Sequence, residues 1–334
     1  MKLGLLGNLP PAKNGAILKD RETIRFNGKD LPVLGRHRIR GEQYLVVDKL
    51  GRLPRQSEKV LRLQSRQRPE EKVIHRLVDN PESWKLIERV KRFQGTRMPF
   101  PKIDNLCQKS GEILVLRDFI EGRSLRWHLR MKKEISAFQA IRIYHQLVCQ
   151  ICFLHRKVGI VHGDLAPENI IVSPAGTSVS LIDFGSSFPF SESANPDTGD
   201  GFREIYQAPE NLLGKSASRR SEQFSAASIF YEMLTGKTPF NLAAKREFKN
   251  RPSKLLPASE QPDSDKRLPQ ALWHLIDKHL SRTLALESSK RFQTLGDWQN
   301  SAEDLLTKAK HPELLELELR NQSVWRRINS WFKR

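Results

Sequence analysis

The sequence predicts an α+β protein with two lobes, the first rich in strands and the second mainly helical. Two observations support this. Between residues 31 and 116, short runs of aliphatic and β-branched residues are separated by glycine and proline, as in strands joined by turns. From residue 137 onward, apolar residues recur at intervals of three and four, as on one face of a helix. A chain of 334 residues is long enough for both lobes, and we expect a functional site in the cleft between them.

The individual elements can be placed in order along the chain. Asn27-Gly28 predicts a tight hairpin turn within residues 24–28. Residues 69–93 lack glycine and carry apolar residues at helical spacing near their end, so a helix is expected there. Strands are expected at residues 31–34, 44–47, 59–63 and 113–116, and further helices at 137–155, 225–234 and 272–280.

Composition limits the class of protein. Hydrophobic residues make up 38% of the chain and charged residues 28%, a balance that excludes a disordered chain and a membrane bundle. No run approaches the ~20 apolar residues of a spanning helix, and the first residues lack the apolar stretch of a secretory signal. With three cysteines, no disulfide framework is expected, and Cys149 and Cys152 are predicted to be buried core residues. We therefore expect a cytoplasmic protein.

The net charge of +19 is unevenly distributed. Residues 1–160 carry a net charge of +18, whereas residues 161–310 carry −1. A basic half of this kind fits an anionic partner or, equally, a solvated basic face. The basic and apolar residues of the tail, 311–334, predict an amphipathic helix that packs on the second lobe or lies at the periphery of an anionic membrane.

The strongest chemical signal lies between His162 and Asp183. Asp164 is followed five residues later by Asn169, and a β-like run then leads to Asp183, 19 residues after Asp164. Transfer of a phosphoryl group from ATP requires a carboxylate that orients and deprotonates the acceptor hydroxyl, and oxygen ligands for Mg²⁺. Asp164 suits the first role, and Asn169 and Asp183 suit the second.

This pattern resembles the protein-kinase superfamily, whose catalytic loop reads H-R-D-L-x-x-x-N and whose metal-binding motif reads D-F-G. The resemblance covers roughly residues 31–307 and is strongest to bacterial Hanks-type serine/threonine kinases. It implies a two-lobed kinase-like fold, ATP and Mg as cofactors, and a protein substrate; a nucleic-acid partner is not favoured. We expect an N-terminal extension at 1–30, a small lobe at 31–117, a large lobe at 118–310 and the tail.

The resemblance continues beyond the two motifs. Residues 206–210 are similar to the A-P-E that ends the family's activation segment, and Arg291 stands where the family places the arginine that pairs with that glutamate, here Glu210. Residues 118–125 resemble the hinge between the lobes. The resemblance implies that backbone groups of Asp118 and Ile120 bind adenine and that Ser124 lies near the ribose.

The small lobe departs from the family pattern in its phosphate-binding loop. Gly41 resembles the last of the loop's glycines, but Arg36 and Arg38 stand where the other two are expected. Glycine allows backbone N–H groups to approach phosphate closely, and arginine does not. Either these arginines contact phosphate through their side chains, or the loop holds nucleotide poorly.

The family's phosphate-binding lysine on the third strand is also replaced. The pattern places Arg62 at that position and Val60 over the adenine, with Lys59 as the competing assignment. Glu88 is the expected carboxylate partner of Arg62. Arginine is not an equivalent replacement, because its guanidinium is wider and its charge is more spread.

Three further departures lie near Asp164. Ala166 replaces a lysine that touches the transferred phosphate, and Gly163 replaces the arginine that reads activation-loop phosphate, so control by such phosphorylation is not expected. Arg203 replaces a threonine. It either supplies the missing positive charge beside Asp164 or lies on a surface loop.

Three functions follow from these residues. The presence of Asp164, Asn169 and Asp183 favours an active serine/threonine protein kinase. The arginines of the small lobe and Ala166 favour a pseudokinase, a regulator that binds nucleotide weakly. A small-molecule phosphotransferase is the third alternative, and the A-P-E segment and Arg291 argue against it.

Overall fold

The computed structural model describes residues 23–26, 29–39, 42–49, 60–65, 71–78, 88–93, 100–109, 112–131, 135–184, 186–189, 204–241, 245, 255–261 and 268–314. These residues belong to two compact units, Met1–Ile120 and Glu121–Arg334. The predicted amphipathic tail lies almost entirely outside the described residues.

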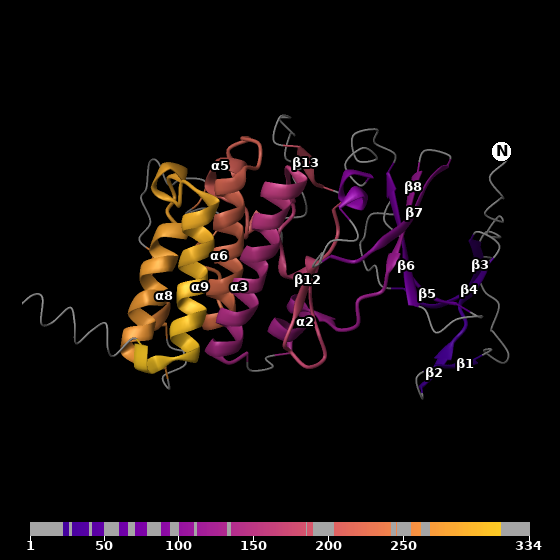
Figure 1. The fold of residues 1–334 in the computed structure, drawn as a ribbon, viewed down its shortest axis with the longest axis horizontal. Coiled ribbons are helices and arrows are strands. Elements are labelled where there is room, and N and C mark those ends of the chain that lie inside the picture. The colour runs from indigo at the N-terminus through magenta and orange to yellow at the C-terminus, as the bar shows by residue number, and fades with distance from the viewer. Residues whose placement is uncertain are drawn as a thin grey trace, which may run out of the picture. The chain divides into compact units, whose positions relative to one another are not determined.

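An antiparallel sheet forms the centre of the N-terminal unit (Figure 1). Its strand order is β3-β4-β5-β6-β8-β7. Four consecutive residues of one strand, Tyr44 to Val47, are buried, so both faces of that strand are covered. The strands are β3 (Gly35–Ile39), β4 (Glu42–Lys49), β5 (Val60–Ser65), β6 (Glu71–Val78), β7 (Ile103–Lys109) and β8 (Glu112–Asp118).

A separate hairpin precedes this sheet. Strands β1 (Thr23–Phe26) and β2 (Lys29–Pro32) pair antiparallel, with Phe26 opposite Lys29. The register leaves Asn27-Gly28 between the paired ends, and the predicted hairpin is confirmed. The strands predicted around residues 44–47, 59–63 and 113–116 are likewise confirmed as β4, β5 and β8.

The helix predicted over residues 69–93 is wrong for residues 71–78. Residues 71–78 form strand β6, and within the described residues only 88–92 are helical. Strand β6 pairs with β5 on one side and β8 on the other, so its backbone N–H and C=O groups are satisfied across the sheet. Its aliphatic residues fit a buried strand as well as a helix, and sheet pairing decides between them.

Long helices dominate the C-terminal unit, and in Figure 1 α3, α6, α8 and α9 lie side by side. The predicted helices at 137–155, 225–234 and 272–280 are confirmed. The helices are α2 (Leu125–Arg130), α3 (Ala137–Phe153), α5 (Pro209–Leu212), α6 (Arg219–Thr235), α8 (Gln270–Thr283) and α9 (Leu295–Lys310), with a π-helical turn η1 (Leu154–Val158) continuing α3. Short 3₁₀ turns are η2 (Pro167–Asn169), η3 (Ala258–Glu260) and η4 (Ser288–Lys290).

Aromatic residues connect these helices. Tyr144 of α3 stacks on Phe230 of α6 with ring centroids 4.3 Å apart, and its hydroxyl lies 2.7 Å from Nε2 of His279 on α8. The Trp298 indole of α9 donates a hydrogen bond to the same hydroxyl at 3.1 Å. One tyrosine therefore joins four helices through ring stacking and hydrogen bonds.

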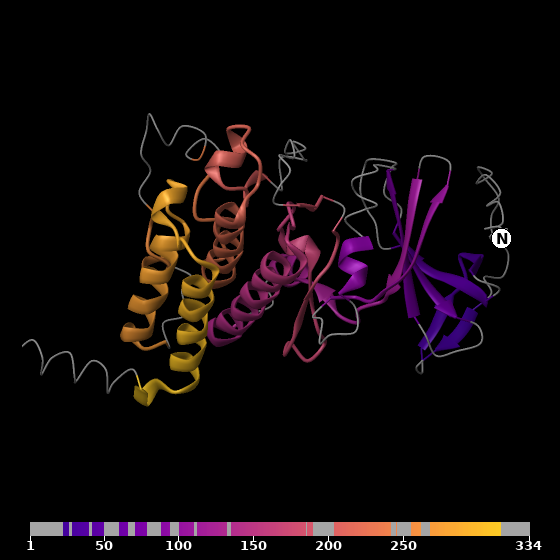
Figure 2. The same ribbon diagram turned by 45° about the horizontal axis from the view of Figure 1, so that its top comes forward.

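Short strands in the C-terminal unit form the frame that carries the candidate site. Strand β11 (Ile170–Val172) pairs antiparallel with β12 (Val179–Leu181) and with β9 (Arg123–Ser124). Figure 2 shows the β11–β12 ribbon next to α3. Strand β10 (Ile160–Val161) pairs with β13 (Phe188–Pro189).

The cysteine pair lies on α3, as predicted. Cys152 is buried and Cys149 is half-buried, and both are free thiols. Burial raises the pKa of Cys152 to about 12 and that of Cys149 above its usual value. Thiolates are disfavoured at both positions. The prediction of a buried core residue is confirmed for Cys152, but it is wrong for Cys149, which is half-buried.

Among the helices that the structure describes, none has both the length and the apolar character needed to cross a membrane.

Candidate functional site

The β11–β12 ribbon brings the three candidate catalytic residues to one place. Asn169 directly precedes β11. One residue, Ile182, separates the end of β12 from Asp183. Ile170 pairs with Leu181, and the Ile182 N–H donates to the Asn169 carbonyl at 2.9 Å. The two ends of the ribbon therefore meet where the chain turns from Asp164 into β11.

Asn169 is joined directly to Asp164. Its Nδ2 donates to the Asp164 backbone carbonyl at 2.8 Å and to the Asp164 carboxylate at 2.9 Å. Asn169 is buried, whereas Asp164 is partly exposed. The amide thus orients the carboxylate, and no hydrogen bond recorded among the described residues uses the Asn169 Oδ1 atom.

Asp183 has a strained backbone. Its φ of 68° makes it the only non-glycine residue with positive φ in the described part of the chain. Such a conformation costs free energy and persists only where the surroundings enforce it, which is common at functional sites. The next residue, Phe184, is buried with its ring 5.4 Å from the His162 ring.

His162 holds the backbone of Asp164 against the segment that precedes Asp183. The Asp164 N–H donates to its Nδ1 atom at 3.3 Å, so its Nε2 atom carries the hydrogen and donates to the Ile182 carbonyl at 3.1 Å. The His162 carbonyl accepts from the Ser187 hydroxyl at 3.0 Å. One fully buried imidazole therefore connects the segment before Asp164 with the segment before Asp183.

The next residue, Gly163, is required by its backbone conformation and its neighbours. Its φ is 81°, and a Cβ atom there would lie 2.3 Å from the Ser186 carbonyl oxygen. Its N–H donates to Oε1 of Glu222 at 2.9 Å, and Oε2 of Glu222 accepts from Nε2 of buried His155 at 2.6 Å. Glycine therefore replaces the family's arginine at a position where any side chain would clash with the backbone of Ser186.

Ala166, the residue at the family's lysine position, is fully buried. Its small apolar side chain supplies no positive charge next to Asp164. Arg203, the expected replacement, lies outside the described residues, as does Gly41.

The sequence did not reveal the Arg126 cluster, which consists of Arg126, Glu168, Tyr206 and Glu232. The Arg126 guanidinium donates to Glu168 at 2.8 Å, to Glu232 at 3.2 Å and to the Tyr206 hydroxyl. The Tyr206 hydroxyl also donates to Glu232 at 2.5 Å. These contacts connect α2, the turn after Asp164, the segment before α5 and α6.

The charges of the Arg126 cluster do not balance. One guanidinium faces two carboxylates, and the buried Oε2 atom of Glu168 has no hydrogen-bond partner among the described residues. Burial and the neighbouring Glu232 raise the pKa of Tyr206. Burial alone would lower the pKa of Arg126, but Tyr206 and Glu168 raise it above its ordinary value, so the guanidinium stays charged. The only sequence signal for this cluster is Glu168, four residues after Asp164.

The ion pair expected between Arg291 and Glu210 is confirmed. The guanidinium donates to both carboxylate oxygens, at 2.6 and 2.9 Å. It also donates to the carbonyls of Ala285, Arg220 and Leu286 and lies over the Phe224 ring. Arg291 is 1% exposed, and this pair fixes the segment before α9 to α5.

The candidate nucleotide-binding residues of the N-terminal unit are described mainly through their backbone. Arg36 and Arg38 lie on β3, opposite Leu45 and Gln43 of β4. Val60 and Arg62 lie on β5, which is separated from β8 by β6.

Glu88, the expected partner of Arg62, lies in the helical residues 88–92 and is half-buried. The structure does not describe the Arg62 side chain, so the Arg62–Glu88 pair stays a prediction.

Three candidate residues surround the boundary between the units. The Asp118 N–H donates to the Lys102 carbonyl at 2.8 Å, and the Asp118 carbonyl accepts from Arg117 at 3.2 Å. No hydrogen bond recorded among the described residues uses the Ile120 N–H. The Ser124 hydroxyl accepts from the Trp127 N–H at 3.3 Å and so caps the start of α2.

Comparison with known proteins assigns the family. Residues 83–299, about two thirds of the chain, match the model of the protein kinase domain. The matched range begins after strand β6, so Arg36, Arg38, Val60 and Arg62 lie outside it.

The curated relatives include bacterial enzymes. The chain is 29% identical over 140 residues to the probable serine/threonine-protein kinase PknB of Lactococcus lactis, which covers 42% of this chain and 22% of that protein. It is 28% identical over 204 residues to the serine/threonine-protein kinase PknD of Mycobacterium tuberculosis, covering 60% of this chain and 30% of that protein. The chain thus spans less than a third of the length of these two relatives.

A solved structure shows the same fold. The kinase PK-1 of the Cydia pomonella granulovirus matches with a TM-score of 0.58 and 19% identity, over 76% of this chain and 92% of that one. The predicted two-lobed α+β fold class is confirmed. The chain belongs to the protein kinase domain family.

Proposed function

We propose that the protein transfers the γ-phosphoryl group of ATP to a serine or threonine hydroxyl of a protein substrate. The bond between Asn169 Nδ2 and the Asp164 carboxylate carries this proposal. It fixes a partly exposed carboxylate, suited to accept the proton of the attacking hydroxyl, beside a residue whose amide oxygen stays available. Glu222 and His162 support the same geometry by accepting hydrogen bonds from the N–H groups of Gly163 and Asp164.

Asn169 and Asp183 fit a divalent cation of the Mg²⁺ type. In the described part of the chain, no three His, Cys, Asp or Glu side chains gather into a metal-binding group. An amide oxygen and a carboxylate suit Mg²⁺, which takes its remaining ligands from phosphate oxygens and water. When bound, such a cation neutralises charge on the transferring phosphoryl group. In this proposal the strained Asp183 backbone orients the carboxylate, and the Asn169–Asp164 bond orients the amide.

The candidate nucleotide-binding residues and Arg203 are part of the same proposal. We infer that backbone groups of Asp118 and Ile120 bind adenine, that Ser124 lies near the ribose, and that Arg36, Arg38 and Arg62 serve the phosphates. The Ile120 N–H, which no recorded hydrogen bond uses, supports the first of these. Arg203 supplies the charge that Ala166 lacks, and Arg203→Ala should lower turnover at least ~10-fold, equivalent to ~1.4 kcal/mol.

The test measures metal-dependent nucleotide binding and turnover on the same protein. ATP affinity is determined by calorimetry with and without Mg²⁺, and phosphorylation of a generic basic protein is followed with labelled ATP. Asp183→Ala should abolish the tightening of ATP binding by Mg²⁺, and Asp164→Asn should retain binding but lose turnover. Asp304→Asn, which removes an exposed carboxylate of α9, is the matched control and should change neither quantity.

A second function, that of a pseudokinase, is favoured by one observation: the fully buried Ala166 leaves the candidate site without a lysine. ATP binding that does not depend on Mg²⁺ and does not change in Asp183→Ala would support this alternative and contradict the proposed transfer reaction.

A further inference from the structure

A fully buried lysine, Lys245, lies in the part of the chain that follows α6. Lysine side chains are almost never fully buried unless their charge is compensated, because removal of an ammonium group from water is unfavourable. The surroundings of Lys245 must therefore compensate its charge. Neither the sequence pattern nor the family resemblance assigned a role to this residue.

Backbone carbonyl groups of one short segment hold the Lys245 ammonium. Its Nζ atom donates to the carbonyls of Glu204, Ile205 and Gln207 at 2.9, 2.6 and 3.0 Å. An ammonium group has three N–H donors, and hydrogen bonds from a charged donor are stronger than those from a neutral one. The segment is itself a turn, since the Gln207 N–H donates to the Glu204 carbonyl at 3.1 Å. Because all three acceptors are backbone groups, the lysine fixes the conformation of residues 204–207 whatever their side chains are.

A fully buried aromatic ring on α6 links Lys245 to Arg291. The Lys245 Nζ atom lies 5.8 Å from the centre of the Phe224 ring, and the Arg291 Cζ atom lies 5.0 Å from the same centre. Both distances are within the ~6 Å range of cation–π attraction. Arg291 holds Glu210 of α5, and Lys245 holds residues 204–207. Two cations at one ring therefore fix consecutive parts of the same segment.

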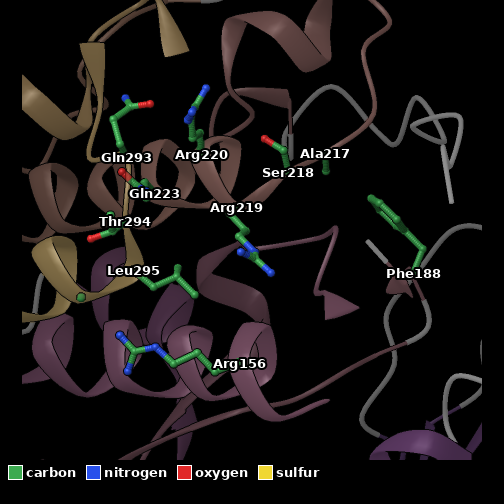
Figure 3. Close-up of a pocket in the computed structure, with 11 residues that line it drawn as sticks. Arg156, Phe188, Ala217, Ser218, Arg219, Arg220, Gln223, Gln293, Thr294 and Leu295 are labelled. Carbon is green, nitrogen blue, oxygen red and sulfur yellow. The ribbon is translucent and has the colours of Figure 1, made fainter. Parts of the chain in front are cut away.

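The start of α6, which carries Phe224, is bound to the segment before α9. The Arg291 guanidinium donates to the Arg220 carbonyl, and Gln223 Nε2 donates to the Phe292 carbonyl, both at 3.0 Å. Figure 3 shows Arg220 and Gln223 on the first turns of α6, in the wall of a cavity of about 660 Å³. The ring that Lys245 and Arg291 share therefore belongs to a part of α6 that is itself held in place.

Tyr206 connects the segment held by Lys245 with the candidate site. It lies between two residues whose carbonyls bind Lys245, and its hydroxyl belongs to the Arg126 cluster. Glu168 of the same cluster directly precedes Asn169, whose Nδ2 donates to the Asp164 carboxylate. A continuous series of hydrogen bonds and backbone links therefore runs from Lys245 to Asp164.

We propose that Lys245 is a positioning residue for phosphoryl transfer, which holds residues 204–207 and, through Tyr206, the turn that follows Asp164. Its charge belongs to the side chain itself, so this ordering requires no modification of the chain. Gly163 stands where the family has the arginine that reads activation-loop phosphate, and the lysine orders the segment instead. The inference rests on the proposed function, because positioning has a catalytic effect only if the protein transfers phosphoryl groups.

The experiment compares the parent with Lys245→Met, which keeps most of the side-chain length and removes the charge and the donors. Hydrogen exchange followed by mass spectrometry reports the protection of the backbone amides of residues 204–212 and requires no activity. Exchange in this segment should become at least ~10-fold faster in the variant. With a generic basic protein as substrate, kcat should fall at least ~10-fold, whereas the Kd for ATP with Mg²⁺ should stay within about 2-fold.

A general loss of folding is distinguished by the number of ATP-binding sites per chain, which calorimetry gives and which unfolding would lower together with kcat. Lys245→Gln keeps two amide donors on a shorter, neutral side chain, and it should retain part of the protection and of the turnover. Lys308→Met is the matched control. This buried lysine of α9 binds Asp304 on its own helix at 3.0 Å, and its loss should change neither exchange in residues 204–212 nor turnover.

The outcomes separate this inference from the proposed function. Unchanged exchange in a folded Lys245→Met would overturn the inference. Faster exchange with an unchanged kcat would refute the positioning role and leave a structural one. A fall in turnover after treatment of the parent with a phosphatase would contradict ordering without modification. A parent that transfers no phosphoryl group would instead overturn the proposed function, and the exchange result would still decide whether Lys245 holds the segment.

Discussion

Two arginines in the C-terminal unit, the buried Arg291 and the partly buried Arg126, differ in how completely their surroundings satisfy them. Arg291 binds both oxygens of one carboxylate and three backbone carbonyls, and charge is balanced one to one. Arg126 faces two carboxylates and a tyrosine, and one buried oxygen of Glu168 stays without a partner. In the first arrangement each carboxylate oxygen accepts a hydrogen bond, and in the second one oxygen accepts none from the described residues.

The difference indicates that the Arg291–Glu210 ion pair contributes more to the stability of the fold than the Arg126 cluster does. Removing one partner from a balanced, dry pair leaves an uncompensated charge, so it is costly. The Arg126 cluster holds surplus negative charge, and the Arg126 and Glu168 side chains are 16% and 36% exposed, so water reaches it. One of its members, Glu168, lies in the turn that follows Asp164. Four predictions test this comparison.

The largest effect is expected for Arg291→Met. The free energy of unfolding should fall by about 3–5 kcal/mol, because Glu210 keeps its charge in a largely buried position without a partner. Denaturation in urea measures this. Arg282→Met is the matched control: this exposed guanidinium lies 4.1 Å from the centre of the Phe292 ring, and its loss should cost at most about 1 kcal/mol. Equal losses for the two variants would refute the structural role of Arg291.

The second prediction extends the comparison to His279, whose ring lies 5.6 Å from that of Phe292. Burial, reinforced by Arg282, lowers the pKa of His279 to about 3, whereas in the unfolded chain it lies at about 6.5. The unfolded chain therefore binds a proton that the folded protein does not. The stability contributed by neutral His279 is complete above pH ~6.5 and is lost as the pH falls toward 3, with a limiting slope of about 1.4 kcal/mol per pH unit.

Denaturation curves between pH 7 and 4 should show this slope in the parent and a shallower one in His279→Gln. Only the slopes are compared, because the substitution also removes hydrogen bonds to Tyr144 and Ser301. Parallel curves for the two proteins would show that His279 does not contribute to acid sensitivity.

The third prediction concerns the turn that contains Gly163. Gly163 and Gly214 have nearly equal φ, 81° and 83°, but only Gly163 has neighbours within 4 Å of an added Cβ atom. Gly214→Ala should cost about 1–2 kcal/mol for its backbone conformation. Gly163→Ala should cost at least about 1 kcal/mol more, because the methyl group meets the Ser186 carbonyl. Similar melting temperatures for the two variants would mean that the turn yields to the methyl group.

The smallest effect is expected in the Arg126 cluster. Arg126→Met should lower the free energy of unfolding by about 1–2 kcal/mol, because the carboxylates it leaves are partly hydrated. Glu168→Gln, which removes the surplus charge but keeps the shape, should change stability by less than about 0.5 kcal/mol. A loss for Arg126→Met as large as that for Arg291→Met would remove the distinction between the two arginines.

Local patterns in the sequence predicted much of the fold and the centre of the candidate site. The Asn27-Gly28 hairpin and the helices of the C-terminal unit follow from turn chemistry and apolar spacing, which act over a few residues. The spacing of Asp164, Asn169 and Asp183 implied a common site, and the β11–β12 ribbon brings these residues to one place. The Arg291–Glu210 pair, 81 residues apart, was predictable only through the family resemblance.

The tertiary structure decided what depends on partners distant in the sequence. Residues 71–78 have apolar residues that suit either a helix or a strand, and pairing with β5 and β8 makes them a strand. Arg126 meets Glu232 across 106 residues. The sequence by itself determined most of the helices, the hairpin and the candidate catalytic groups, because these depend on neighbouring residues. Which charges are balanced depends on long-range packing, and only the folded chain reveals it.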